Sequence, residues 1–301
     1  MTTRPANDLV EIFGYAPDDL SPAARTLWAL SACPFVSKPC SKSNHDGSVI
    51  YGTCSVTTAY GDCIICPNRL YDRGYASLKL VAAEAFDSRT KFMMFDEYIA
   101  KRSTVTDCVV ALGRNSGREV NLGRKMSMDW VLARINRGRL IGYTGVEVQS
   151  IDITGNYRDT WHAYKNFSPR TKSIPTSKHG LNWANVHKRL IPQLIRKGLM
   201  YSRSTLVRHG LFFVVPEIVY KKFEEVLGYD LPVVTRLGKD VLTIHTYELT
   251  PHERHGVQRE AIVKRKIRVP LAEFAERFVS GPSLPPAQEL DSAIRRVLAL
   301  A

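Results

Sequence analysis

Residues 145–152 read GVEVQSID and place two polar side chains on a segment that is otherwise apolar. In a strand, side chains two residues apart point to the same face, so Glu147 and Gln149 share one face while Val146 and Val148 share the other. A carboxylate in such a setting costs free energy unless a partner compensates its charge.

The segment before this stretch supplies a second acid. Residues 128–135 (MDWVLARI) and 140–151 (LIGYTGVEVQSI) both have strand character, and the Gly-bearing connection NRGR predicts a hairpin. With a three-residue loop from Arg137 to Arg139, residue 136 pairs with residue 140. Asp129 then lies opposite Glu147, and Gln149 lies further along the same face.

Two carboxylates held this close repel each other unless a cation joins them. Mg²⁺ accepts oxygen ligands, keeps several waters and is completed by substrate phosphate oxygens. It also lowers the pKa of a bound water and neutralises charge that builds up on phosphorus. The pattern favours phosphodiester hydrolysis with Asp129 and Glu147 as Mg²⁺ ligands. The alternative is a pair of surface acids on an exposed strand face.

The charge of the chain points to a polyanion as partner. The net charge is +13, and residues 155–210 contain eleven Lys and Arg residues but a single acid, Asp159. Tryptophan and histidine side chains are interleaved with these cations, which favours a nucleic-acid surface over an ordinary solvated face.

Five of the six cysteines lie within residues 33–66, and the sixth is Cys108. Without a secretion signal, such a cluster favours a metal site over disulfides. We expect four thiolate ligands at Cys40, Cys54, Cys63 and Cys66, with the knuckle CIIC supplying the last two. Zinc is the default metal and iron the alternative. Cys33 could replace Cys40, and buried cysteines without a metal are the alternative interpretation.

Strands and helices alternate without a regular βαβ repeat, which predicts an α+β or mixed α/β fold with a mixed sheet flanked by helices. We divide the chain into a helical N-terminal segment (1–32), a metal-binding module (33–70), a catalytic core with a basic loop and helix (71–215) and C-terminal strands and helices that complete the fold (216–301). The chain lacks an apolar run of membrane-spanning length and a signal peptide, so we expect a cytoplasmic protein without a membrane partner.

Several strings together resemble the NotI family of type II restriction endonucleases, over roughly residues 33–160. They are CPFVSKPC, GTCSVTTAYGDCIICPNRLY, GRNSGREVNLG, SMDWVLARI and GVEVQSID. The order Asp129, hairpin and Glu147-x-Gln149 is similar to the PD-(D/E)xK nuclease core. It departs from that pattern at Met128, where Pro is frequent, and at Gln149, where Lys is usual.

The resemblance implies a restriction-endonuclease-like fold with a small four-cysteine metal-binding module. It assigns catalysis to Asp129, Glu147 and Gln149, with catalytic Mg²⁺ on the two acids, and one structural iron to Cys40, Cys54, Cys63 and Cys66. It further implies that a homodimer cleaves double-stranded DNA at a GC-rich palindrome centred on GGCC, with CGGCCG as the six-base candidate, and leaves 5′ overhangs. A bacterial host would need a cognate DNA methyltransferase.

A two-fold dimer reads each half of a palindrome with the same residues, and Arg, Lys and acidic side chains distinguish G from C in the major groove. Candidates are the charged residues that directly follow the catalytic strand: Arg158, Asp159, Arg170, Lys172 and Lys178. Each could instead contact a phosphate or only solvent. Two other functions stay open, namely a metal-stapled DNA-binding regulator without catalysis and a repair or junction nuclease.

Overall fold

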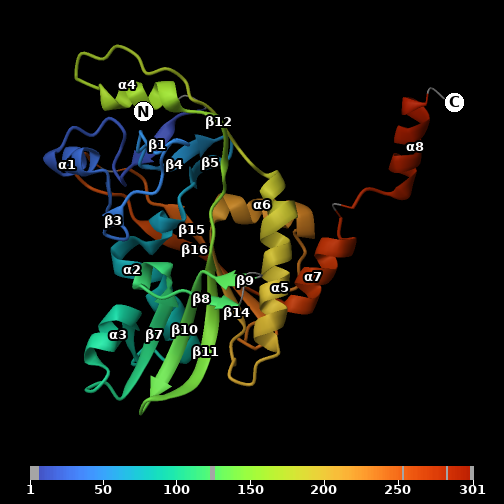
Figure 1. Ribbon diagram of the computed structural model, residues 1–301. Helices are drawn as coiled ribbons and strands as arrows, with labels where there is room; N and C mark the ends of the chain where they lie inside the picture. The colour runs from blue at the N-terminus through green and yellow to red at the C-terminus, as the bar shows by residue number, and fades with distance from the viewer. Residues whose placement is uncertain (1–6, 123–125, 253, 283, 299–301) are drawn as a thin grey trace.

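The predicted hairpin supplies two inner strands of the largest sheet in the computed structural model, which describes residues 7–122, 126–252, 254–282 and 284–298 (Figure 1). Strand β10 (Trp130–Asn136) pairs antiparallel with β11 (Arg139–Val148). The predicted three-residue loop is wrong, because Asn136 pairs with Arg139 and only Arg137 and Gly138 connect the strands. Both have positive φ, 47° and 72°, as a two-residue type I′ turn requires.

The predicted register at the other end of the hairpin is confirmed all the same. A β-bulge follows Arg134, which faces Gly142, while the next residue, Ile135, faces Leu140. The extra residue on β11 offsets the shorter loop. Trp130 therefore faces Val146, and Asp129 comes level with Glu147.

Five more strands extend the hairpin into a seven-stranded sheet of order β16-β15-β14-β11-β10-β7-β6. The parallel pairs are β11 with β14 (Leu211–Pro216), β14 with β15 (Val241–Leu249) and β6 (Lys91–Met94) with β7 (Asp107–Gly113). The pairs of β7 with β10 and of β15 with β16 (Ala261–Pro270) are antiparallel. The prediction of a mixed sheet flanked by helices is confirmed.

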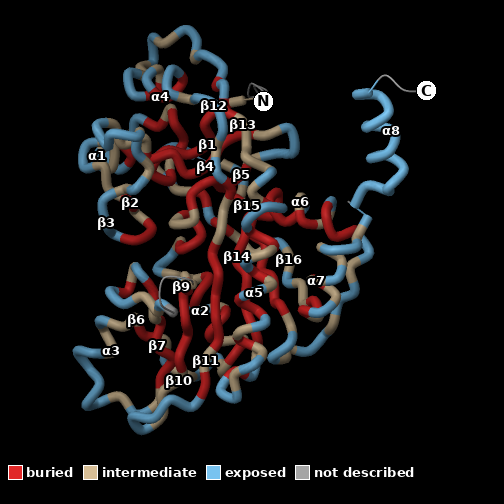
Figure 2. Tube along the Cα trace, turned by 45° about the vertical axis from the view of Figure 1, so that its right-hand side comes forward, coloured by how far each residue is buried: buried red, intermediate tan, exposed pale blue. Residues whose placement is uncertain are grey.

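Helices cover both faces of this sheet. On one face, α2 (Asp72–Phe86) packs against the buried side chains of Val146 and Val148. On the other face lie α5 (Ile191–Ser202), α6 (Glu217–Leu227) and α7 (Leu271–Ser280). The short α3 (Phe95–Lys101) lies beside β6 and β7. The central strands are accordingly buried along much of their length (Figure 2).

Helix α5 approaches β11 closely, and two local features allow this. A π-helical turn, η3 (Val186–Leu190), leads into α5, whose first turn contains Pro192. Gly145 on β11 carries no Cβ, and a Cβ there would overlap the ring of Tyr201 on α5. The helix can therefore bring its side chains directly onto the strand that carries Glu147.

A second sheet, of order β1-β4-β5, stands beside the first. Its strands are β1 (Leu9–Ile12), β4 (Thr53–Thr58) and β5 (Gly61–Ile64). The N-terminal segment is thus only partly helical, because β1 precedes α1 (Pro22–Leu30); Ser21 caps α1 through the N–H of Ala24. The short pair β2 (Ala32–Cys33) and β3 (Lys38–Pro39) and the 3₁₀ turn η1 (Pro67–Tyr71) complete this part.

A buried arginine ties distant segments together here. Arg69 is fully buried, and its guanidinium donates to the carboxylate of Glu11 on β1. The same group donates to the backbone carbonyl of Arg259, 190 residues later in the chain, at 2.6 Å. A buried ion pair of this kind tolerates the loss of one partner poorly, because the other charge is left without compensation.

The remaining elements are peripheral. Strands β8 (Val120–Leu122) and β9 (Met126–Met128) form one pair, β12 (Ile153–Asn156) and β13 (Lys178–Leu181) another, and η2 (Arg114–Ser116) follows β7. Helix α4 (Arg158–Lys165) lies in the connection between β12 and β13, at the top of Figure 1. Helix α8 (Ala287–Val297) projects from the body, and all its residues are exposed (Figure 2).

Candidate functional site

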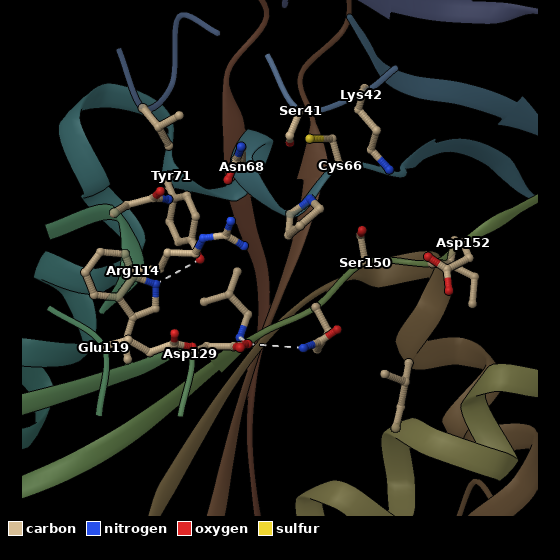
Figure 3. Close-up of a pocket in the computed structure, with 18 of the residues that line it drawn as sticks. Ser41, Lys42, Cys66, Asn68, Tyr71, Arg114, Glu119, Asp129, Ser150 and Asp152 are labelled. Atoms are coloured by element: carbon tan, nitrogen blue, oxygen red, sulfur yellow. Dashed lines mark hydrogen bonds between the residues drawn. The ribbon is translucent and has the colours of Figure 1, made fainter. Parts of the chain in front are cut away.

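A cleft of about 740 Å³ opens at the carboxyl end of β11 (Figure 3). Residues 129–130 and 148–152, from the base of the hairpin, form one side. Residues 36–42 and 66–71, from the cysteine-rich part, form the opposite side, and further residues come from the turn after β7 and from η3 and α5. Figure 3 shows Asp129 across the opening from Ser41, Lys42 and Cys66.

Asp129 and Gln149 line this cleft together. One carboxylate oxygen of Asp129, Oδ2, accepts hydrogen bonds from the backbone N–H of Val148 at 3.0 Å and from the side-chain amide of Gln149 at 3.1 Å. These two bonds leave the other oxygen, Oδ1, able to take a further partner. Gln149 therefore orients the Asp129 carboxylate.

Glu147 lies directly behind Asp129 and is only 2% exposed. Its Oε1 accepts a hydrogen bond from the backbone N–H of Asp129 at 3.4 Å, and its Oε2 accepts one from Nζ of Lys197 on α5. The side chain of Lys197 is 10% exposed. The predicted partnership of Asp129, Glu147 and Gln149 in one site is thus matched by the geometry, with a buried ammonium added.

Burial perturbs both carboxyl groups. Burial, followed by the charge of Asp129, raises the pKa of Glu147 to about 8, although Lys197 acts to lower it. Burial also raises the pKa of Asp129, against the lowering effects of Lys197 and of the hydrogen bonds from Val148 and Gln149. At neutral pH and without a metal ion, Glu147 therefore tends to keep a proton.

A buried Lys197 was not predicted from the sequence, although its spacing from apolar residues of the same helix indicates burial. Lys197 lies three residues after Leu194 and four before Tyr201, and both neighbours are buried. A lysine on the apolar face of an amphipathic helix must find a partner in the interior. Because Lys197 was grouped with the other cations of a basic helix, its place on the apolar face of that helix was overlooked.

Cys33, Cys40, Cys54 and Cys66 lie near enough to influence one another electrostatically, and Cys66 lines the cleft. Burial is the main cause that raises the pKa of each thiol, and the four also perturb one another, since Cys33 raises the pKa of the other three. Backbone N–H groups donate to three of the sulfurs, from Phe35 and Val36 to Cys33, from Lys42 to Cys40 and from Asn68 to Cys66. Hydrogen bonds of this kind stabilise metal-bound thiolates.

Cys63 lies apart from this group. It sits within β5 opposite Val56 and is fully buried in the core cluster that contains Val56, whereas Cys33 and Cys54 belong to the cluster on the other side. Burial and Asp62 raise the pKa of Cys63 to about 12, and no cysteine of the described chain contributes. Of the four cysteines predicted as ligands, the structure thus groups Cys40, Cys54 and Cys66 with Cys33, while Cys63 lies outside this group. Within the CIIC string, Cys63 belongs to the β4–β5 ladder, whereas Cys66 follows the end of β5.

The four sulfurs do not form a metal coordination site in this structure. Among the residues that the structure describes, no group of three or more His, Cys, Asp or Glu side chains converges tightly enough to hold a metal ion. The chemistry of the four sulfurs nevertheless fits a soft metal with a closed tetrahedral shell. The carboxylate pair fits one hard divalent ion that keeps most of its waters.

The five predicted DNA contacts lie elsewhere. Arg158 and Asp159 begin α4 and form an exposed ion pair at 3.7 Å, while Arg170, Lys172 and Lys178 are exposed on the following loop and on β13. None of the five lines the cleft.

Four other cations line the cleft: Lys38, Lys42, Arg114 and Arg189. Lys42 lies two residues after Cys40, and Arg114 directly follows strand β7 at Gly113. Arg189 lies in the basic segment 155–210 that the sequence singles out, whereas Lys38, Lys42 and Arg114 come from two other segments, and only the fold brings all four to one cleft. A phosphate group in the cleft would meet these side chains on the way to Asp129.

No family model and no curated protein matches the chain. None of the described helices is long and apolar enough to cross a membrane.

Proposed function

We propose that this protein is a type II restriction endonuclease that hydrolyses phosphodiester bonds of double-stranded DNA. The observation that carries the proposal is the juxtaposition of Asp129, Gln149 and the buried Glu147 behind them, where Asp129 and Gln149 line a cleft together with four cations. Two carboxylates and an amide suit a Mg²⁺ ion and an attacking water, and the cations suit the phosphates of the substrate.

In this mechanism Asp129 and Glu147 would hold Mg²⁺, which would supply positive charge to the phosphate and to the attacking water. Gln149 keeps the Asp129 carboxylate in one orientation and can direct the water. Lys42, Arg114 and Arg189 bind phosphates of the DNA backbone. The exposed charges from Arg158 to Lys178 contact flanking or recognised base pairs, and a homodimer presents two such sites to a palindrome centred on GGCC.

We further propose that Cys33, Cys40, Cys54 and Cys66 hold one structural metal, iron with zinc as the alternative. Ser41 and Lys42 line the cleft directly after Cys40, and Pro67 and Asn68 do so directly after Cys66. A metal on the four sulfurs would fix this wall of the cleft. A closed four-thiolate shell leaves no position for a substrate, so its role is structural.

Incubation of the purified protein with a sequenced plasmid that carries CGGCCG sites tests the function. We expect discrete fragments with ends at those sites in Mg²⁺ and no cleavage in chelator. Specific binding without cleavage at any divalent-ion concentration would instead indicate a DNA-binding regulator. Preferential cutting of branched DNA would indicate a repair or junction nuclease.

Mg²⁺ binding should depend on pH because the metal needs the ionised form of Glu147. With the pKa of this group at about 8, the apparent affinity should rise with pH up to about 8 and level off above it. Calorimetric titration in two buffers of different protonation enthalpy should show proton release at about pH 7 and little at a pH well above the pKa. Glu147→Gln, the control, should show no such release, and an affinity that does not change across the pKa would contradict the assignment.

A further inference from the structure

Lys197 is the cation that contacts the carboxylate pair from behind. Its Nζ donates to Glu147 Oε2, and both side chains are at least nine-tenths buried. Neither Lys197 nor Glu147 lines the cleft, while Asp129 does. The ammonium therefore faces the interior side of the pair, and a substrate phosphate would approach from the opposite side.

The strand itself supplies no positive charge to this pair. Position 149, which follows Glu147 on the same face, is a neutral glutamine whose amide donates to Asp129. The positive charge comes instead from α5, which the absence of a Cβ at Gly145 allows to approach β11 through Tyr201. Lys197 is one helical turn before Tyr201 and is thereby held at a fixed place over Glu147.

The charges of these groups decide what Lys197 does. Asp129 and Glu147 together carry two negative charges when ionised, and Lys197 cancels one of them. A divalent ion then turns the site net positive, whereas without Lys197 it would leave the site neutral. The lysine must weaken cation binding through like-charge repulsion, and it must strengthen the attraction of the loaded site for the extra negative charge of the transition state at phosphorus.

We propose that Lys197 is a positioning residue of the carboxylate site. Its charge lowers the affinity of the site for the metal ion and raises the rate of DNA cleavage by the metal-loaded site. The effect on cleavage rate rests on the proposed nuclease function, whereas the effect on metal affinity rests on the geometry alone. It assigns to α5 the fixed charge that the neutral Gln149 cannot provide.

The test compares Lys197→Met with Arg196→Met, a matched control one residue away on the exposed side of α5. Mn²⁺ alone serves as probe and its binding is followed by electron paramagnetic resonance at about pH 9, where fewer protons compete for the carboxylates. We expect K197M to bind Mn²⁺ about tenfold more tightly than the wild type. R196M should bind it as the wild type does.

The second measurement is single-turnover DNA cleavage at saturating Mg²⁺. K197M should cleave about 100-fold more slowly despite its tighter metal binding, and Lys197→Arg, which keeps the charge, should recover part of the rate. A merely structural lysine would give lower metal affinity together with a lower melting temperature, and that result would overturn the inference. So would cleavage by K197M at the wild-type rate.

The Mn²⁺-binding measurement distinguishes failure of this inference from failure of the proposed function. If the wild type binds Mn²⁺ but cuts no DNA, the nuclease proposal fails, while tighter Mn²⁺ binding by K197M still supports the opposing charge of Lys197. Unchanged or weaker Mn²⁺ binding by K197M overturns the inference in either case. Should K197M fail to fold, Lys197→Gln takes its place in both measurements, because its amide can still donate to Glu147.

Discussion

Asp129→Asn and Glu147→Gln are each expected to reduce the DNA cleavage rate at least ~10³-fold while the fold is kept. Each change removes one negative charge from the pair that we assign to Mg²⁺, and metal-ion stabilisation of the transition state contributes several kcal/mol. Asn and Gln keep the acceptor oxygens that the N–H of Val148 and the ammonium of Lys197 use. The measurement is single-turnover cleavage of a DNA duplex with one CGGCCG site.

Asp107→Asn provides the control for this experiment. Asp107 is a carboxylate of the same sheet, but it faces Asn136 at the far end of the hairpin and pairs with Arg134. This variant should cleave within about threefold of the wild type, since partly exposed ion pairs contribute little. Cleavage by D129N or E147Q at the rate of D107N would show that the carboxylate pair is not the catalytic site, and circular dichroism would show whether each variant is folded.

Cys33→Ala is expected to abolish stoichiometric metal binding, whereas Cys63→Ala is expected to retain it. Both residues are buried, so both changes remove a similar volume from the interior. Only Cys33 belongs to the group of thiols that perturb one another. Protein expressed in iron-replete medium should show a ferric-thiolate absorption in the wild type and in C63A, and elemental analysis should give one metal per chain.

The stability of the two variants should differ as well. Metal binding contributes to folding because the site does not exist in the unfolded chain. C33A should melt roughly 10 °C below C63A. A metal content that C33A keeps and C63A loses would restore the ligand set expected from the sequence, and stoichiometric zinc in iron-replete protein would identify the other metal.

The hairpin shows how far a sequence can predict a site. Strand pattern and a Gly-bearing turn placed Asp129 level with Glu147, and the structure has that register. The agreement depends on two local features that offset each other, a two-residue loop and a bulge beside Arg134. Sequence pattern could predict neither, because the side-chain alternation that buries Val146 and Val148 determines the register, and the turn then adapts to it.

The cysteines and the cations show where prediction from sequence fails. CIIC has the spacing of a metal knuckle, yet Cys63 is paired within the β4–β5 ladder and only Cys66 lies beyond the end of that ladder. Lys42, Arg114 and Arg189 meet in one cleft from widely separated positions in the chain. The proximity of these three side chains depends on how β7, η3 and the cysteine-rich loops pack together. The secondary-structure propensity of each segment carries no information on that packing.

The contacts of Arg69 have a consequence for the order in which the chain folds during synthesis. Its guanidinium is buried between Glu11 and the carbonyl of Arg259, so the contact is complete only after most of the chain has left the ribosome. Contacts of such long sequence separation form late, because loop closure must precede them. Residues of η1 line the cleft, so this wall of the cleft is complete only once the part of the chain that contains Arg259 has folded against it.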